Sequence, residues 1–74
     1  MTKSMNRIEK LRSKLEEIQE EIDNLASEMQ DTYDSRSERW QESEKGEEYQ
    51  EQIDALEEAS QSVGDAVDTL SEVE

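Results

Sequence analysis

The sequence lacks the residue types on which most catalytic and metal sites depend. None of its 74 residues is Cys, His, Pro or Phe. Without Cys and His, the chain cannot form disulfides, thiolate or imidazole metal sites, or nucleophiles activated by His. Aromatic residues make up only 4% of the chain, which leaves too few side chains of this kind for a β-rich core. These absences exclude a disulfide scaffold, a β domain and Ser-His or Cys-His catalysis.

Long apolar runs are missing as well. No stretch approaches the roughly 20 apolar residues of a membrane-spanning helix, and no apolar segment follows the basic N-terminal residues as it would in a secretory signal. We therefore expect a small cytoplasmic protein with no membrane partner. Charge is abundant instead, because 22 acidic residues against 8 basic ones give a formal net charge of −14. This balance argues against direct binding to nucleic acid.

The apolar residues of the first half follow a heptad spacing. They alternate in steps of three and four at Ile8, Leu11, Leu15, Ile18, Ile22, Leu25 and Met29. Such spacing is typical of an amphipathic coiled-coil helix, and disordered chains of similar composition do not keep it. The pattern predicts a helix over about residues 4–34, with the greatest burial near Ile22 and Leu25.

A second heptad pattern occupies the C-terminal half. It runs through Tyr49, Ile53, Leu56, Ser60, Val63, Val67 and Leu70, and it predicts a helix over about residues 44–72. Gly64 lies within this helix, where glycine costs about 1 kcal/mol relative to alanine. Two interpretations are open: the small residues let another helix approach closely, or they are a tolerated weak point.

Neither heptad pattern continues through residues 35–43, which predicts a compact connector. Ser43 is a candidate N-cap for the second helix, and Ser37 is a competing N-cap for a short helical turn at residues 38–42. Two helices of matching length joined by a short connector form an antiparallel hairpin.

Charge distribution supports that pairing. Residues 3–14 carry five basic side chains and one acidic one, whereas residues 46–74 carry ten acidic side chains and no basic one. An antiparallel hairpin places these two segments side by side. A single pair of helices still leaves one flank of each apolar face in water, and a two-fold dimer would cover it. We therefore predict an all-α fold in which residues 1–74 form one antiparallel two-helix coiled-coil hairpin that dimerises into a four-helix bundle.

The remaining residues give little sign of catalysis. Adjacent carboxylates such as Glu16-Glu17 and Glu57-Glu58 resemble acid–base pairs, but on exposed helices they are solvated faces. No calcium loop or Glu-x-x-His metal motif is present. We expect no enzyme activity, cofactor or metal.

Two features stand out as candidates for binding a protein partner. The first is Trp40 in the connector, close in sequence to Tyr33, Arg36 and Arg39, since Trp beside Arg is frequent at interface hot spots. The alternative, which we favour, is that Trp40 folds back on Met29 and Tyr49 and closes the end of the bundle. The second is the acidic second helix, whose carboxylates either mimic nucleic acid or serve solubility or a high-salt cytoplasm.

The connector also resembles that of a known group of sequences. The run Trp40-Gln41-Glu42-Ser43-Glu44-Lys45-Gly46, within residues 33–59, is similar to a Leu/Trp-Gln-x-Ser-x-x-Gly stretch in uncharacterised Glu-rich hairpin proteins of bacteria, phages and mobile elements. The resemblance implies a small cytoplasmic or phage-encoded hairpin protein and implies no activity.

Three classes of function follow. The first is a self-assembling protein–protein interaction module without enzyme activity. The second is a phage- or mobile-element-encoded inhibitor that mimics nucleic-acid charge and blocks a basic host or defence protein, so that its partner would be a basic nucleic-acid-binding protein. The third is a helical oligomer that binds a small anionic nucleotide, which the net charge of −14 disfavours.

Overall fold

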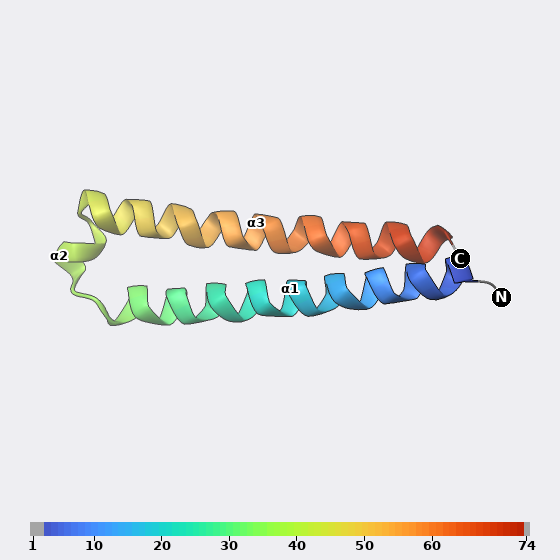
Figure 1. Ribbon diagram of the computed structural model, residues 1–74. Coiled ribbons are helices and arrows are strands. Elements are labelled where there is room, and N and C mark those ends of the chain that lie inside the picture. Colours follow the sequence, from blue (N-terminus) through green and yellow to red (C-terminus); the bar gives the residue numbers. More distant parts are fainter. Residues whose placement is uncertain (1–2, 74) are drawn as a thin grey trace.

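The protein is a pair of long helices lying side by side (Figure 1). The computed structural model describes residues 3–73, with side chains from residue 6 onward. Helix α1 spans Lys3–Ser35, a short helix α2 spans Glu38–Gln41, and helix α3 spans Glu44–Val73. No strand occurs in residues 3–73, so the all-α prediction is confirmed.

The two long helices run antiparallel, as the predicted hairpin requires. The start of α1 and the end of α3 lie at the same end of a rod that measures 58 × 15 × 12 Å (Figure 1). Near this end Arg12 Nη1 donates a hydrogen bond to Ser71 Oγ at 3.4 Å. The basic start of α1 therefore lies beside the acidic end of α3, although the side chain of Lys3 is outside those described.

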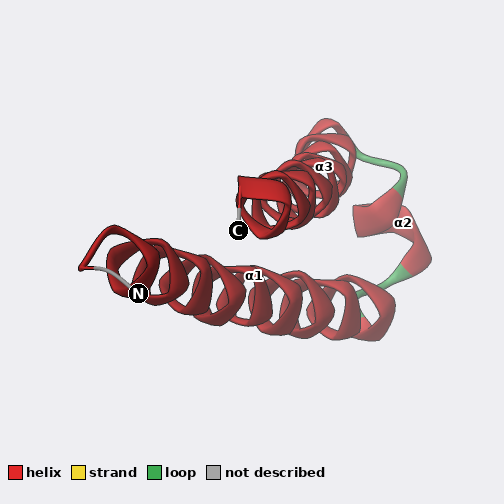
Figure 2. Ribbon diagram, turned by 90° about the vertical axis from the view of Figure 1, so that its right-hand side faces the viewer, coloured by secondary structure: helices red, strands yellow, loops and turns green. Residues whose placement is uncertain are grey.

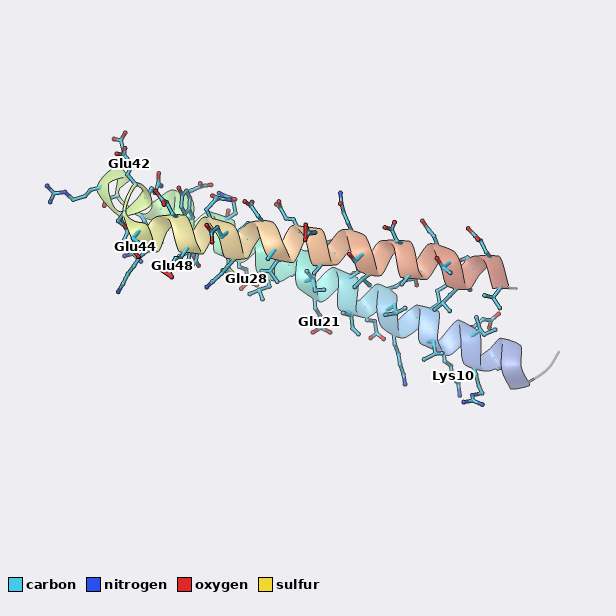
Figure 3. All side chains as sticks on the ribbon, turned by 90° about the horizontal axis from the view of Figure 1, so that it is seen from above. Lys10, Glu21, Glu28, Glu42, Glu44 and Glu48 are labelled. Carbon is cyan, nitrogen blue, oxygen red and sulfur yellow. The ribbon has the colours of Figure 1, made fainter. Side chains whose placement is uncertain are left out.

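The axes of α1 and α3 cross at an angle. Figure 2 shows the crossing end-on. In Figure 3 the two helices overlap near the connector and lie apart at the opposite end, whereas in Figure 1 they lie apart near the connector and close together at the opposite end. The helices therefore cross each other along the rod, and the connector joins them at one end.

The helix boundaries lie within one residue of those expected from the heptad patterns. The expected helices were 4–34 and 44–72, and the observed ones are Lys3–Ser35 and Glu44–Val73. In the connector, both competing caps are used. The Ser37 Oγ accepts a hydrogen bond from the backbone N–H of Trp40 at 3.2 Å and begins α2, and the Ser43 Oγ accepts one from the N–H of Gly46 at 3.2 Å and begins α3.

Burial is concentrated in the half of the hairpin next to the connector. Ile53 is fully buried, and Ala26, Gly46 and Ser60 are also buried. The hydroxyl of Ser60 donates to the Asp23 carboxylate of α1, so its buried polar atom is satisfied. Among the described side chains, none before residue 26 or after residue 60 is buried.

The heptad positions of α1 divide into two columns with different surroundings. Ile8, Leu15, Ile22 and Met29 are half-buried against α3. Leu11, Ile18 and Leu25 are 53%, 45% and 47% exposed. The expected burial of Leu25 is therefore not found within one hairpin. The physical reason is that α3 packs on the first column and on the residues four positions further along, such as Gln19 and Ala26, which turns the second column away from the contact.

Candidate interaction surfaces

An aromatic cluster holds the connector against the two long helices. The Trp40 ring lies between Tyr33 of α1 and Tyr49 of α3, with centroid distances of 5.9 and 5.6 Å and edge-to-face angles of 64° and 70°. The guanidinium carbon of Arg36 lies 4.1 Å from the centre of the Trp40 ring, which is cation–π geometry. Both arrangements are stabilising for aromatic rings that keep one edge in water.

Side-chain hydrogen bonds fix the path of the connector backbone. Gln41 Nε2 donates to the carbonyl oxygen of Tyr33 at 2.8 Å, in the last turn of α1, and to that of Arg36 at 3.3 Å, just after α1. The Ser43 hydroxyl donates to the Trp40 carbonyl while it caps α3. The carbonyl oxygens of Tyr33 and Trp40 also accept backbone hydrogen bonds, from the N–H groups of Arg36 and Ser43, so the side chains add second bonds to a turn that the backbone already holds. The N–H of Gly46 is one of the groups that a helix start leaves without a backbone partner.

Gly46 is required by close packing at the start of α3. A Cβ atom at this position would lie 2.5 Å from the Gln41 carbonyl oxygen and 2.7 Å from its carbon, and it would also clash with the Trp40 carbonyl. These neighbours are backbone atoms and cannot rotate away. The residues of the Trp-Gln-x-Ser-x-x-Gly stretch therefore all serve the shape of the turn: an aromatic plug, a carbonyl bridge, a cap and a close approach.

The structure brings three of the four connector candidates together. Tyr33, Arg36 and Trp40 form the aromatic cluster, and the Trp40 ring is half-buried in it. Arg39 is exposed in α2. The packing of Trp40 on Tyr49 is the arrangement in which Trp40 closes the end of the hairpin, and a partner contact through this cluster remains a prediction.

A second surface is formed by apolar side chains that α3 leaves uncovered. We call Leu11, Ile18 and Leu25 the α1 stripe; they lie seven residues apart and so follow one line along the helix. Leu56, Val63 and Leu70, the α3 stripe, have the same spacing on α3 and are half-buried. Each stripe is continuous over two heptads, in contrast to the scattered apolar residues of an ordinary protein surface.

The two stripes lie on the same side of the hairpin. Each stripe residue of α1 follows by three positions a residue that packs on α3, such as Leu15 before Ile18. Each stripe residue of α3 likewise follows one that faces α1, such as Ser60 before Val63. A step of three residues turns a side chain by about 60° around the helix axis, in the same sense on both helices when each is viewed along its own chain direction. Because α1 and α3 are antiparallel, these two turns bring both stripes to the same side of the hairpin. The hairpin therefore has one apolar face.

The opposite side of the hairpin is polar. A shallow groove there is lined by Glu16, Gln19, Gln61, Gly64, Asp65, Val67 and Asp68. Gln19 Nε2 donates to the Ser60 carbonyl at 3.1 Å and lies where a side chain at Gly64 would be. Gly64 thus makes room for a polar contact between α1 and α3.

The described residues form no metal site and no membrane-spanning segment. Within residues 3–73, no group of three or more Asp and Glu side chains is arranged to hold a metal ion. Over the same residues, neither long helix has an apolar stretch that could cross a membrane. No protein-family model, curated protein or solved structure matches the chain.

Sequence reasoning included the α1 stripe among the heptad positions but did not single it out as an open surface. An a/d heptad pattern marks both columns as apolar and does not say which one a neighbouring helix covers. A usable signal was present in Ala26 and Tyr33, which widen the apolar face toward the column of Arg12 and Gln19. The helix that packs there covers this wider side and leaves Leu11, Ile18 and Leu25 open.

Proposed function

We propose that the chain is a non-enzymatic, cytoplasmic interaction module that assembles with itself through the apolar face made by the α1 and α3 stripes. The observation that carries this proposal is the exposure of Leu11, Ile18 and Leu25, each about half accessible, in one line along α1. Contiguous apolar surface of this kind marks interaction sites on small proteins.

The size of the hairpin supports the same proposal. A rod 15 × 12 Å in cross-section has little interior, and Ile53 is its only large side chain with no exposure among the described residues. Chains of this length bury a smaller fraction of their surface on folding than larger domains do, and oligomerisation is a common way to bury more. A second copy that covers both stripes would bury their apolar side chains and add a second apolar layer to the one between α1 and α3.

Sedimentation equilibrium at micromolar concentration tests the proposal with one substitution and a matched control. Ile18→Asp places a charge in the middle of the α1 stripe, and we expect it to yield a helical monomer of 8.6 kDa. Ser13→Asp adds the same charge at an exposed position outside the stripe, and we expect it to associate like the unsubstituted protein. An unsubstituted protein that sediments as a monomer at 100 micromolar would refute self-assembly.

The second candidate function, an inhibitor that mimics nucleic acid, is favoured by the charge of α3. All Asp and Glu side chains from Glu47 to Glu72 are exposed, and no basic residue interrupts them. Binding to a basic nucleic-acid-binding protein would then weaken steeply as salt rises, by analogy with phosphate contacts. The test is competition: the protein should displace duplex DNA from a non-specific basic DNA-binding protein at low salt. Absence of displacement at 50 mM salt would eliminate this candidate.

A further inference from the structure

We infer that the partner on the apolar face is a second copy in one defined orientation. A two-fold axis passes beside Ile18 and Val63, so that α1 packs antiparallel on α1 of the other copy and α3 on its α3. This inference rests on the proposed self-assembly and specifies its geometry. Three features support this geometry: the charges beside the α1 stripe, the spacing of both stripes, and the position of Ile18 and Val63 at the same height along the hairpin.

The charges that flank the α1 stripe are complementary to themselves when α1 is reversed. The column next to the stripe, on the side away from α3, consists of Arg7, Lys14, Glu21 and Glu28 at intervals of seven residues. Its sign changes once, between Lys14 and Glu21. In Figure 3, Lys10, Glu21 and Glu28 project from the same side of α1. An antiparallel copy centred on Ile18 therefore sets Lys14 beside the other copy's Glu21, and Arg7 beside its Glu28.

The spacing of the apolar residues has the same centre. About an axis at Ile18, Leu11 of one copy meets Leu25 of the other, since these two residues lie seven positions on either side. About an axis at Val63, Leu56 meets Leu70 for the same reason. A two-fold axis requires the same contacts in both directions, and both stripes satisfy this requirement.

The two centres lie at the same height in the hairpin. Gln19, the residue after Ile18, donates to the Ser60 carbonyl at 3.1 Å and lies next to Gly64, the residue after Val63. Ile18 and Val63 are therefore level, within about one turn of helix. One axis perpendicular to the helices passes both residues, so the α1 and α3 contacts form in a single rigid arrangement.

The outer flank of the α3 stripe allows two acidic helices to meet. Beside the stripe, on the side away from α1, the residues are mostly uncharged and include Ala55, Ala59 and Ala66. The exceptions are Lys45 and Glu48 near the connector, and the other carboxylates of α3 lie on its other sides. Small uncharged residues permit close approach without like-charge repulsion. In the alternative dimer, with α1 on the other copy's α3, the charged column of α1 would face these alanines and remain unpaired. In the proposed orientation the charged flank of α1 meets the charged flank of the other copy's α1, and the uncharged flank of α3 meets that of the other copy's α3.

A charge-swap series tests the orientation. Lys14→Glu sets like charges beside Glu21 of the other copy at two symmetric places, and we expect association to weaken about five- to ten-fold. Glu21→Lys should weaken it by a similar factor, although it lowers the net negative charge. The double variant Lys14→Glu with Glu21→Lys should regain the original affinity. General repulsion predicts instead that Glu21→Lys strengthens association, and that outcome would overturn the orientation.

Cysteine pairing gives an independent measurement, because the chain has no cysteine of its own. We expect an oxidised equimolar mixture of Leu11→Cys and Leu25→Cys chains to form the mixed 11–25 disulfide in preference to 11–11 and 25–25, since disulfides require Cα atoms within about 7 Å. A mixture of Leu56→Cys and Leu70→Cys should behave likewise. If the unsubstituted protein associates but the cysteine variants form the 11–11 and 25–25 pairs, the orientation is wrong and self-assembly stands. If the unsubstituted protein is monomeric, self-assembly itself fails.

Discussion

The two halves of the hairpin share one heptad pattern but differ in packing. One half lies beside the connector, and the other carries the start of α1 and the end of α3. Beside the connector, Ile53 is fully buried, Ala26 and Ser60 are 7% exposed, and three aromatic rings close the end. In the other half, none of the described side chains before residue 26 or after residue 60 is buried, and the residues that face the other helix, such as Ile8, Leu15 and Val67, are only half-buried. The same heptad spacing therefore goes with different degrees of burial, and burial is greatest in the half that the connector and its aromatic cluster hold together.

The largest expected difference between the halves concerns two isoleucines on the inner side. Ile53→Ala removes a fully buried side chain, and we expect a loss of about 3 kcal/mol in the free energy of unfolding. Ile8→Ala removes a half-buried one near the end opposite the connector and should cost about 1 kcal/mol. Urea unfolding followed by circular dichroism measures both, at one protein concentration, because association adds to apparent stability. Equal losses would mean that the two halves are packed alike.

The two glycines of α3 offer the next comparison. Gly46→Ala should destabilise by about 2 kcal/mol, because its Cβ would press on the carbonyl groups of Trp40 and Gln41. Gly64→Ala meets only the end of the Gln19 side chain, 2.8 Å from its Nε2, and that side chain can move. The better helix propensity of alanine, about 1 kcal/mol, then offsets the lost contact with Ser60. Thermal melts of both variants check this, and a Gly46→Ala protein as stable as the original would show that the turn tolerates a wider path.

Hydrogen exchange of backbone amides compares the halves without substitution. In protein diluted until it is monomeric, we expect protection to be greatest around Ala26 and Ile53 and to fall toward Arg12 and Leu70, by about ten-fold or more in exchange rate, because opening requires less burial to be lost near the ends. Mass spectrometry of short peptides resolves this gradient. Uniform protection along both helices of the diluted protein would contradict the difference between the halves.

The smallest expected effect concerns two hydrogen bonds that join α1 to α3. Gln19→Ala removes a part-buried bond of 3.1 Å in the middle of the hairpin and should cost about 1 kcal/mol. Ser71→Ala removes the exposed acceptor of Arg12, at 3.4 Å, and should cost less than about 0.5 kcal/mol. Denaturant midpoints rank the two variants. A larger loss for Ser71→Ala would contradict the lower burial of the half away from the connector.

The helices and the antiparallel pairing could be predicted because period and charge act over many residues. Seven apolar positions in α1 agree on one period, so a single exception would not change the prediction. The two competing caps, Ser37 and Ser43, could not be decided from sequence because they do not exclude each other, and the structure uses both. The turn is long enough to hold a helix of one turn between them.

Prediction was less successful where the answer depends on a neighbour in space. Leu25 was expected to be well buried, and it is half exposed, because the crossing of α3 decides which of two equivalent columns is covered. The function of Gln41 as a bridge to the carbonyl of Tyr33 was not foreseen either. An amide side chain in a connector carries no periodic signal, and its partners become clear only when the backbone folds back on itself.

The gradient of contacts away from the connector also suggests an order of folding. The sequence separation of the contacts grows with distance from the connector. Gln41 bonds Tyr33 eight positions away, Gln19 bonds Ser60 at a separation of 41, and Arg12 bonds Ser71 at a separation of 59. Each contact made near the turn shortens the loop that the next one must close, so the entropic cost is met in small steps. We therefore expect the helix contacts to form first near Trp40 and then progressively further from the connector. Substitutions in the connector should slow folding, whereas substitutions near Arg12 should mainly speed unfolding.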